Sequence, residues 1–253
     1  MTVHTEPSAD DDVPLISNRF LYRLTAIIAL LAAVTVAISL AGRWYGEHMA
    51  LGGHTASPEV FSVQIGTDTI ALAANTIRNR EQRHSGPTER VDLYLTWPGL
   101  EGYRDDLKAQ FNSITGPGHL LFLQLSQGTM TRDMSGRLGP IYSHMFEGAP
   151  LPAPHGLTMH RLRADSGYRD EVIYTAKRDG MPDYVVRCLV PVEAQLATGG
   201  DCQRDIRVGR DLSVLYRFSA AVLKDWYHID AAISAFVEER LSGGIPGTGG
   251  NSL

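Results

Sequence analysis

The longest apolar run of the chain lies near its N-terminus. From Leu24 to Gly42 the sequence has no charge, no side-chain amide and no proline. A helix rises about 1.5 Å per residue, so this segment covers roughly the 30 Å of hydrocarbon in a bilayer. The core helix of a soluble domain normally keeps a polar face, whereas only Thr25, Thr35 and Ser39 interrupt this run. The pattern predicts a transmembrane helix over residues 24–42, with the lipid bilayer as its partner.

The residues that flank this run favour an uncleaved anchor. Trp44 and Tyr45 follow it, and aromatic residues are typical of the membrane interface. A cleaved signal peptide is the competing interpretation, because Ser39-Leu40-Ala41 resembles a cleavage site with small residues. The apolar stretch, however, exceeds the usual signal-peptide core of roughly 7 to 15 residues, and a long polar segment precedes it.

The orientation is predicted from the basic residues beside the run. Arg19 and Arg23 lie on its N-terminal side and Arg43 on the other, a small bias toward a cytoplasmic N-terminus. We therefore expect a single-pass protein of the inner (plasma) membrane, with everything after Gly42 periplasmic or extracellular. The alternative is a reversed span with a cytoplasmic domain, and the charge difference is too small to exclude it.

The composition divides the rest of the chain into segments. Residues 1–23 are predicted to be a disordered cytoplasmic tail, because they are rich in Ser, Thr, Pro and Asp. Residues 43–59 are expected to be a stalk, since Gly46, Gly52, Gly53 and Pro58 should interrupt a continuing helix. Residues 60–241 form the folded domain, and the Gly-rich residues 242–253 are predicted to be a disordered tail.

Alternating apolar and polar positions predict several strands in the domain. In residues 90–97, Val91, Leu93 and Leu95 share one face. Turn residues at 66–68 and 179–180 predict two hairpins. Strands are expected at residues 60–65, 69–74, 90–97, 119–127, 156–164, 170–178, 183–191 and 202–209. These connections predict a mostly antiparallel sheet.

Three stretches have helical spacing. Apolar residues recur every three or four positions in residues 100–114 and 130–146, and Gly139-Pro140 should divide the second stretch into two short helices. Residues 150–156 are expected to be a proline-rich connection. The clearest helix covers residues 219–241, with Ser219 as its N-cap and Asp230 outside its apolar stripe. The fold class is thus α+β, with this amphipathic C-terminal helix packed on the sheet.

The two cysteines of the chain are Cys188 and Cys202. Disulfides persist in oxidising compartments, so the predicted location of the domain favours a bond between them. Both lie in predicted strands joined by a turn-rich segment, and the bond would connect these strands. The alternative is two buried, reduced thiols that behave as small apolar side chains.

Charge and motifs exclude several classes of function. The formal charge is −5 and the basic residues form no cluster, so we expect no nucleic-acid partner. The sequence lacks the zinc-protease, nucleophile-elbow, P-loop and dinucleotide motifs and has no Cys-x-x-Cys pair. We therefore predict no catalytic residue, no metal site and no cofactor. Trp97, Tyr103, Arg137 and Tyr142 are candidates for the lining of a groove, with core packing as the simpler interpretation.

Two functions remain open from the sequence. The preferred one is a membrane-anchored envelope protein whose extracytoplasmic domain binds another envelope protein or has a structural role. The alternative is an envelope hydrolase that uses carboxylates and histidines gathered by the fold. Its candidate residues are Asp105, Asp106, His155, His160, Asp170 and Glu171.

Overall fold

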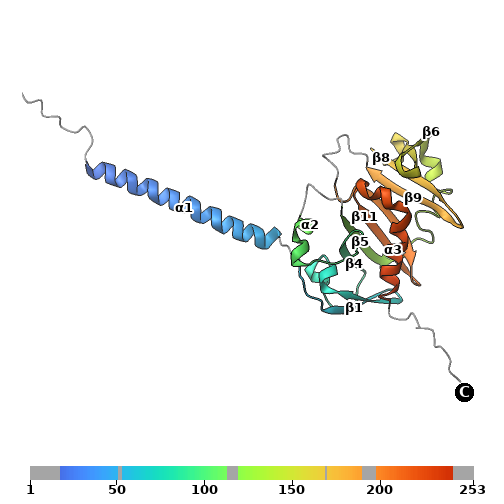
Figure 1. Ribbon diagram of the computed structural model, residues 1–253, viewed down its shortest axis with the longest axis horizontal. Helices are drawn as coiled ribbons and strands as arrows, with labels where there is room; N and C mark the ends of the chain where they lie inside the picture. The colour runs from blue at the N-terminus through green and yellow to red at the C-terminus, as the bar shows by residue number, and fades with distance from the viewer. Residues whose placement is uncertain (1–17, 51–52, 113–118, 169, 190–197, 242–253) are drawn as a thin grey trace, which may run out of the picture. The chain divides into compact units, whose positions relative to one another are not determined.

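The computed structural model describes residues 18–50, 53–112, 119–168, 170–189 and 198–241 (Figure 1). It divides into two compact units, Met1–Gly52 and Gly53–Leu253. The predicted tails at residues 1–17 and 242–253 lie outside the described residues, as does the turn-rich segment 190–197 between the two cysteines.

The first unit is described as one helix, α1 (Asn18–Ala50). Its residues Asn18–Gly42 are apolar enough and long enough to cross a membrane, and all of them are exposed. A membrane anchor and a signal sequence share these properties. The prediction that Gly46 interrupts the helix is wrong, because α1 continues to Ala50. A single glycine costs a helix only about 1 kcal/mol, which does not end it.

The second unit is built on an eight-stranded sheet in the order β4-β5-β11-β10-β9-β8-β7-β6, in which each pair of neighbouring strands is antiparallel (Figure 1). The α+β prediction is confirmed. Its strands are β4 (Arg90–Thr96), β5 (Leu120–Gln127), β6 (Phe146–Pro152), β7 (Thr158–Leu162), β8 (Glu171–Arg178), β9 (Met181–Leu189), β10 (Cys202–Val208) and β11 (Leu212–Phe218). A smaller sheet has the order β2-β1-β3, from β1 (Val60–Ile65), β2 (Asp68–Ala73) and β3 (Gly86–Pro87).

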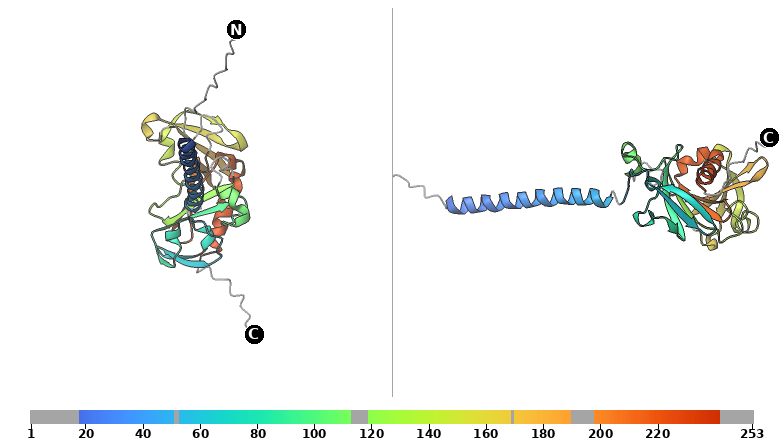
Figure 2. Two further views of the ribbon diagram at one scale, coloured as in Figure 1. Left: turned by 90° about the vertical axis from the view of Figure 1, so that its left-hand side faces the viewer. Right: turned by 90° about the horizontal axis from the view of Figure 1, so that it is seen from below.

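One face of the large sheet carries the core and is covered by the C-terminal helix (Figures 1 and 2). The α-helix α3 (Trp226–Glu238) follows a 3-10 helix, η8 (Ala220–Asp225). Ser219 caps η8 by accepting a hydrogen bond from the Ala221 N–H, as its sequence position predicted. Alternate residues of β5, β10 and β11 are buried against α3, so the intervening residues of these strands face the other side.

The large sheet is nearly divided in two between β9 and β10. These strands pair at Cys202 with Cys188 and at Gln203 with Arg187, and the Leu189 N–H donates to the Asp201 main-chain oxygen beside them, whereas β10 pairs with β11 along all seven of its residues. Cys188 and Cys202 are directly opposite each other and form a disulfide bond. The bond therefore joins the two halves of the sheet at the point where their ladder is shortest.

Several predicted elements differ from the structure. The helix expected over residues 100–114 is limited to η3 (Asp105–Leu107) and α2 (Lys108–Asn112), because Gly102 and Tyr103 lie against the Asn75 main chain instead of continuing a helix. Residues 134–141 form turns rather than a helix, and η4 (Tyr142–Met145) follows them. The proline-rich connection of residues 150–156 is divided between the end of the edge strand β6 and the 3-10 helix η5 (Pro154–Gly156). The strand β11 was not expected at all.

Candidate functional site

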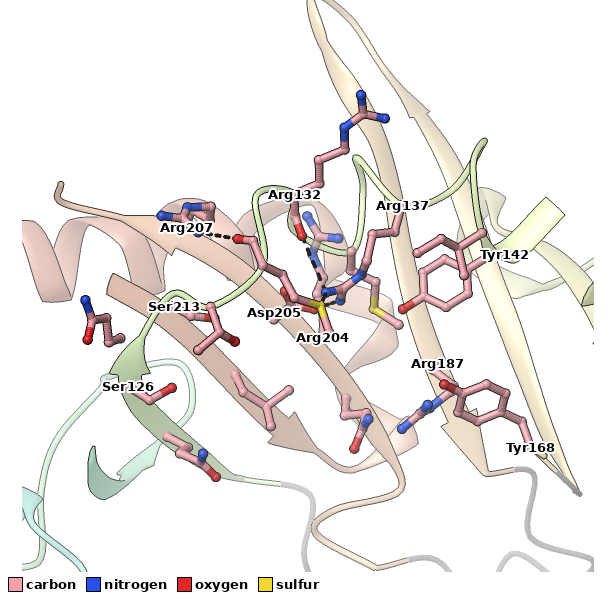
Figure 3. A pocket seen from close by; sticks show the side chains of 18 residues that line it. Ser126, Arg132, Arg137, Tyr142, Tyr168, Arg187, Arg204, Asp205, Arg207 and Ser213 are labelled. Atoms are coloured by element: carbon pink, nitrogen blue, oxygen red, sulfur yellow. Dashed lines mark hydrogen bonds and ion pairs between the residues drawn. The ribbon is translucent and has the colours of Figure 1, made fainter. Parts of the chain in front are cut away.

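A groove of about 360 Å³ lies on the face of the large sheet that α3 does not cover (Figure 3). Its floor consists of the outward-facing residues of β5, β11 and β10, and it reaches β9 at Arg187. Ser126, Gln203 and Ser213 give the floor short polar groups. The segment of residues 129–142 forms the opposite wall. We call this cavity the arginine groove, since arginine is the commonest residue type in its lining.

Five arginines and one carboxylate are among the described residues that line the arginine groove. The carboxylate is Asp205. The arginines are Arg132, Arg137, Arg187, Arg204 and Arg207. Asp205 forms an ion pair with Arg137, and the partners of the other three paired arginines lie outside the lining: Glu171 for Arg187, Asp230 for Arg204, and Asp211 for Arg207 at 3.9 Å. Among the described residues of the lining, Arg132 is the arginine without an ion pair.

Two contacts of opposite direction attach the wall to the floor. Arg137 of the wall donates a hydrogen bond to Asp205 of β10. Arg207 of β10 donates to the main-chain oxygen of Met130 in the wall, at 2.6 Å. The Arg137 Nη1 atom also lies 2.8 Å from the Met130 sulfur. The wall is therefore positioned by guanidinium groups that are themselves part of the groove.

Burial changes the acid–base properties of two groups here. Burial raises the pKa of Asp205 above its ordinary value, and the nearby Arg137 charge opposes this effect without cancelling it. Burial likewise raises the pKa of the Tyr142 hydroxyl. Tyr142 is neutral at physiological pH, so it contributes an aromatic surface and a hydrogen-bonding group but no charge.

A second hollow of about 130 Å³ adjoins the arginine groove, and both are lined by Gln124 and Leu215. Arg78 and Arg217 line this hollow together with Asp92, which forms an ion pair with Arg90 at 3.5 Å, and Arg78 lies over the Phe122 ring at 5.1 Å. Within the described ranges, none of Arg78, Arg217 and Arg132 makes an ion pair. Positive charge therefore continues past the groove to the neighbourhood of β4.

The other face of β10 carries a buried ionic cluster. The Arg204 side chain is 1% exposed and donates to Asp230 of α3 at 2.7 Å and to the main-chain oxygen of Val185 in β9 at 2.7 Å. Arg178 and the Tyr216 hydroxyl also donate to Asp230. Burial alone would raise the pKa of Asp230, but the hydrogen bonds and charges of these partners hold it below its ordinary value.

The six residues of the hydrolase hypothesis are not gathered into one site. Among the described residues, no hydrogen bond or ion pair links any two of them, and no cluster of metal-ligating side chains occurs. Asp106 pairs with Arg104, His160 lies 2.9 Å from the Thr175 hydroxyl, and Glu171 pairs with Arg187. His155 and Asp170 are exposed turn residues with positive φ, and Asp105 begins η3.

The four groove candidates from the sequence separate into two pairs. Arg137 and Tyr142 line the arginine groove. Trp97 and Tyr103 are buried in the core instead, and Trp97 donates a hydrogen bond to Asp225.

Sequence reasoning missed the remaining arginines of the groove, although a signal for one of them, Arg207, exists. In β10, Gln203, Asp205 and Arg207 alternate with Cys202, Ile206 and Val208. This alternation assigns the polar residues to one face.

Comparisons with known proteins identify a related fold. No protein-family model matches the chain, and no curated protein matches it. An immunity protein of the Stenotrophomonas maltophilia type IV secretion system is similar in structure, with a TM-score of 0.50 and 16% identity over 75% of this chain and 96% of that one. The iron-regulated outer membrane lipoprotein FrpD of Neisseria meningitidis has a TM-score of 0.42 and 8% identity over 74% and 97%. At 16% identity, the first likeness shows a shared fold.

Proposed function

We propose that this chain is a single-pass membrane protein whose second unit binds another protein of the cell envelope. In this proposal residues 1–23 are cytoplasmic, residues 24–42 span the inner (plasma) membrane, and the domain of residues 60–241 is periplasmic or extracellular. The observation that carries the proposal is the exposed apolar helix Asn18–Gly42 ahead of a compact domain that contains a disulfide.

The disulfide supports the location of the domain. Cys188 and Cys202 are 1% and 0% exposed, and the described part of the chain contains no free cysteine. Disulfides of this structural kind persist in the periplasm and in extracellular proteins and are rare in the cytosol.

The composition of the arginine groove supports binding. Its wall presents Met130 and Ile141, which are 61% and 43% exposed, beside several arginines and Tyr142. Arginine, tyrosine and methionine are enriched in protein interfaces. The carboxylates and histidines of the hydrolase hypothesis lie elsewhere and apart, so binding is the function that the geometry favours.

A reporter enzyme fused after Leu241 of the full chain tests the location. We expect activity only from a reporter that functions outside the cytoplasm, together with recovery of the protein in the membrane fraction at its full length. Activity of a cytoplasm-only reporter would overturn the proposed orientation. A shortened product in the soluble envelope fraction would show instead that residues 24–42 are a signal sequence.

Crosslinking in intact cells tests the binding role. We expect a crosslinked species that contains this chain and one specific envelope protein, recovered from wild-type cells through a tag on the full chain. A matched version with residues 53–241 replaced by an unrelated secreted domain should not give that species. Recovery of the uncrosslinked chain alone under several conditions would contradict the proposal.

A narrower version of the proposal is an immunity role, which is the role of the S. maltophilia protein that shares the fold. Immunity would be one form of protein binding by this domain. The identity of the crosslinked partner distinguishes this version from the broader one.

A further inference from the structure

We propose that the arginine groove, together with the adjoining hollow, binds an acidic, extended segment of a partner protein that also carries an apolar side chain. This inference rests on the proposed binding function and names the surface and the chemistry of the partner. Three features of the described residues lead to it: the surplus of guanidinium groups, their spread across the sheet, and the apolar residues at the rim.

The guanidinium groups exceed the carboxylates that offset them. Four arginines of the groove are paired: Arg137 with Asp205, Arg187 with Glu171, Arg204 with Asp230, and Arg207 with Asp211. Arg132 and Arg217 form no ion pair among the described residues and are exposed. A guanidinium group offers up to five N–H donors in a planar arrangement that matches a carboxylate with two parallel hydrogen bonds. The free donors therefore favour a ligand with several carboxylates.

The spread of these groups favours an extended ligand over a single small anion. They occur on β11, on β10 and on β9, and Arg78 lies in the hollow beside β4 and β5. Neighbouring strands are about 4.8 Å apart, so the distance from β4 to β9 is on the order of 15–20 Å. An extended peptide advances about 3.3 Å per residue and covers this distance with roughly five or six residues.

The rim of the groove adds an apolar contact that a bare anion does not use. Met130 and Ile141 are both exposed and both line the groove, and each belongs to the wall that Arg137 and Arg207 position. Methionine, tyrosine and arginine are all enriched in protein interfaces, and arginine and tyrosine are among the residues that contribute most to binding. We therefore assign the groove to a protein segment that combines carboxylates with a leucine-sized side chain.

A fluorescent eight-residue peptide of alternating glutamate and leucine tests the chemistry directly. Binding is measured by anisotropy on the detergent-solubilised full chain, beside the same peptide with glutamine in place of glutamate. We expect saturable binding of the acidic peptide that weakens as salt rises, because screening acts on exposed charges within about 10 Å at 0.1 M salt. Equal binding of the glutamine peptide would overturn the proposal. Displacement of the acidic peptide by inorganic phosphate at a similar concentration would overturn it as well, in favour of a simple anion site.

Matched variants locate the binding. The double variant Arg132→Ala/Arg217→Ala removes two exposed side chains that form no ion pair within the described residues, so the fold should be unaffected. It should weaken peptide affinity by at least about tenfold, since arginines are frequent among the residues that dominate binding. Arg161→Ala, an exposed arginine of β7 outside both hollows, is the control and should change affinity less than about twofold. Equal losses from both variants would refute the groove as the site.

The same double variant separates this inference from the proposed function. In the crosslinking experiment, a partner that is captured by the wild type and lost in Arg132→Ala/Arg217→Ala supports both. A partner captured equally by both proteins overturns the groove assignment and leaves the binding function intact. Absence of a captured partner for the wild type counts against the proposed function itself, while the peptide measurement still tests the chemistry of the groove.

Discussion

Arginines lie on both faces of strand β10, and the two faces use them differently. Arg204 faces α3, is 1% exposed, and has hydrogen-bond partners in Asp230 and the Val185 main chain. Arg207 faces the groove, is exposed, and lies near the unpaired Arg132. The residue type is the same, but Arg204 is buried with all its described contacts inside the core, whereas Arg207 reaches solvent beside a weaker contact with Asp211 at 3.9 Å and a hydrogen bond to the Met130 main-chain oxygen. Burial and pairing, rather than sequence composition, distinguish the two roles.

The carboxylates on the two faces show the same contrast. Asp230 receives hydrogen bonds from two arginines and a tyrosine, so its pKa is lowered in spite of its burial. For Asp205 burial outweighs its single arginine partner, so its pKa is raised. The cluster around Asp230 therefore stabilises ionised groups in the core, and the groove face holds its carboxylate less favourably. Each prediction below tests one part of this difference.

The largest effect is expected from Asp230→Ala. Removing this carboxylate leaves Arg204 buried without its anionic partner and Arg178 without its own, which typically costs about 3–5 kcal/mol of unfolding free energy. The measurement is denaturant unfolding of the full chain in detergent. Glu238→Ala on the same helix is the control, because Glu238 is exposed, and it should change stability by less than about 0.5 kcal/mol. A loss of less than about 1 kcal/mol for Asp230→Ala would show that the cluster does not hold the fold together.

A somewhat smaller effect is expected from the double variant Cys188→Ala/Cys202→Ala. A disulfide that closes a loop of about 15 residues contributes on the order of 3 kcal/mol to the free energy of unfolding. Its loss in the variant should therefore lower Tm by roughly 6–12 °C for a domain of this size. Thermal unfolding followed by circular dichroism measures it. Reduction of the wild type should give the same decrease, and reduction of the variant should have no further effect. An unchanged Tm would mean that the Arg204 hydrogen bond to β9 suffices to join the two halves of the sheet.

The sequence predicted those parts of the fold whose signals are local. The hairpin turns at residues 66–68 and 179–180, the Ser219 cap and the antiparallel α+β domain follow from alternation and turn chemistry. The predicted 100–114 helix is present only over residues 105–112 of its described part, because the Tyr103 N–H donates to the Asn75 main chain instead of continuing a helix, which no spacing rule detects. Residues 212–218 were missed although Leu212, Val214, Tyr216 and Phe218 alternate regularly.

The candidate site was less predictable than the fold. The groove depends on strands β5, β9, β10 and β11 becoming neighbours, and their order in the sheet is not encoded in any one of them. Asp230 was placed outside the apolar stripe of its helix, which was wrong. The spacing of Trp226, Asp230, Ile233 and Val237 by four, three and four residues puts it on the buried face. A carboxylate in that position, with an arginine in the apolar face of β10, was the available signal for a buried ion pair.

The smallest expected effect is a difference in pH dependence between Asp230→Asn and Asp205→Asn. Asp230 has a lowered pKa in the folded protein. The stability that it contributes is therefore fully present at a pH above its pKa in the unfolded chain and is lost as the pH falls through its pKa in the folded state. Asp205 has a raised pKa in the folded protein. The stability that it contributes is therefore fully present at a pH below its pKa in the unfolded chain, which is close to the ordinary 3.8. This stability is lost as the pH rises through the pKa of the folded state.

Denaturant unfolding of both variants and the wild type from about pH 3 to pH 6 measures this difference. As pH rises over this range, the wild type should become more stable relative to Asp230→Asn and less stable relative to Asp205→Asn. The sign is decisive because both substitutions remove the same group from nearly the same depth, with side-chain exposures of 13% for Asp230 and 15% for Asp205. The hydrogen-bond donors and charges around the two carboxylates differ instead. If both differences changed in the same direction, burial alone would govern the two sites. The buried cluster and the arginine groove would then not be electrostatically distinct.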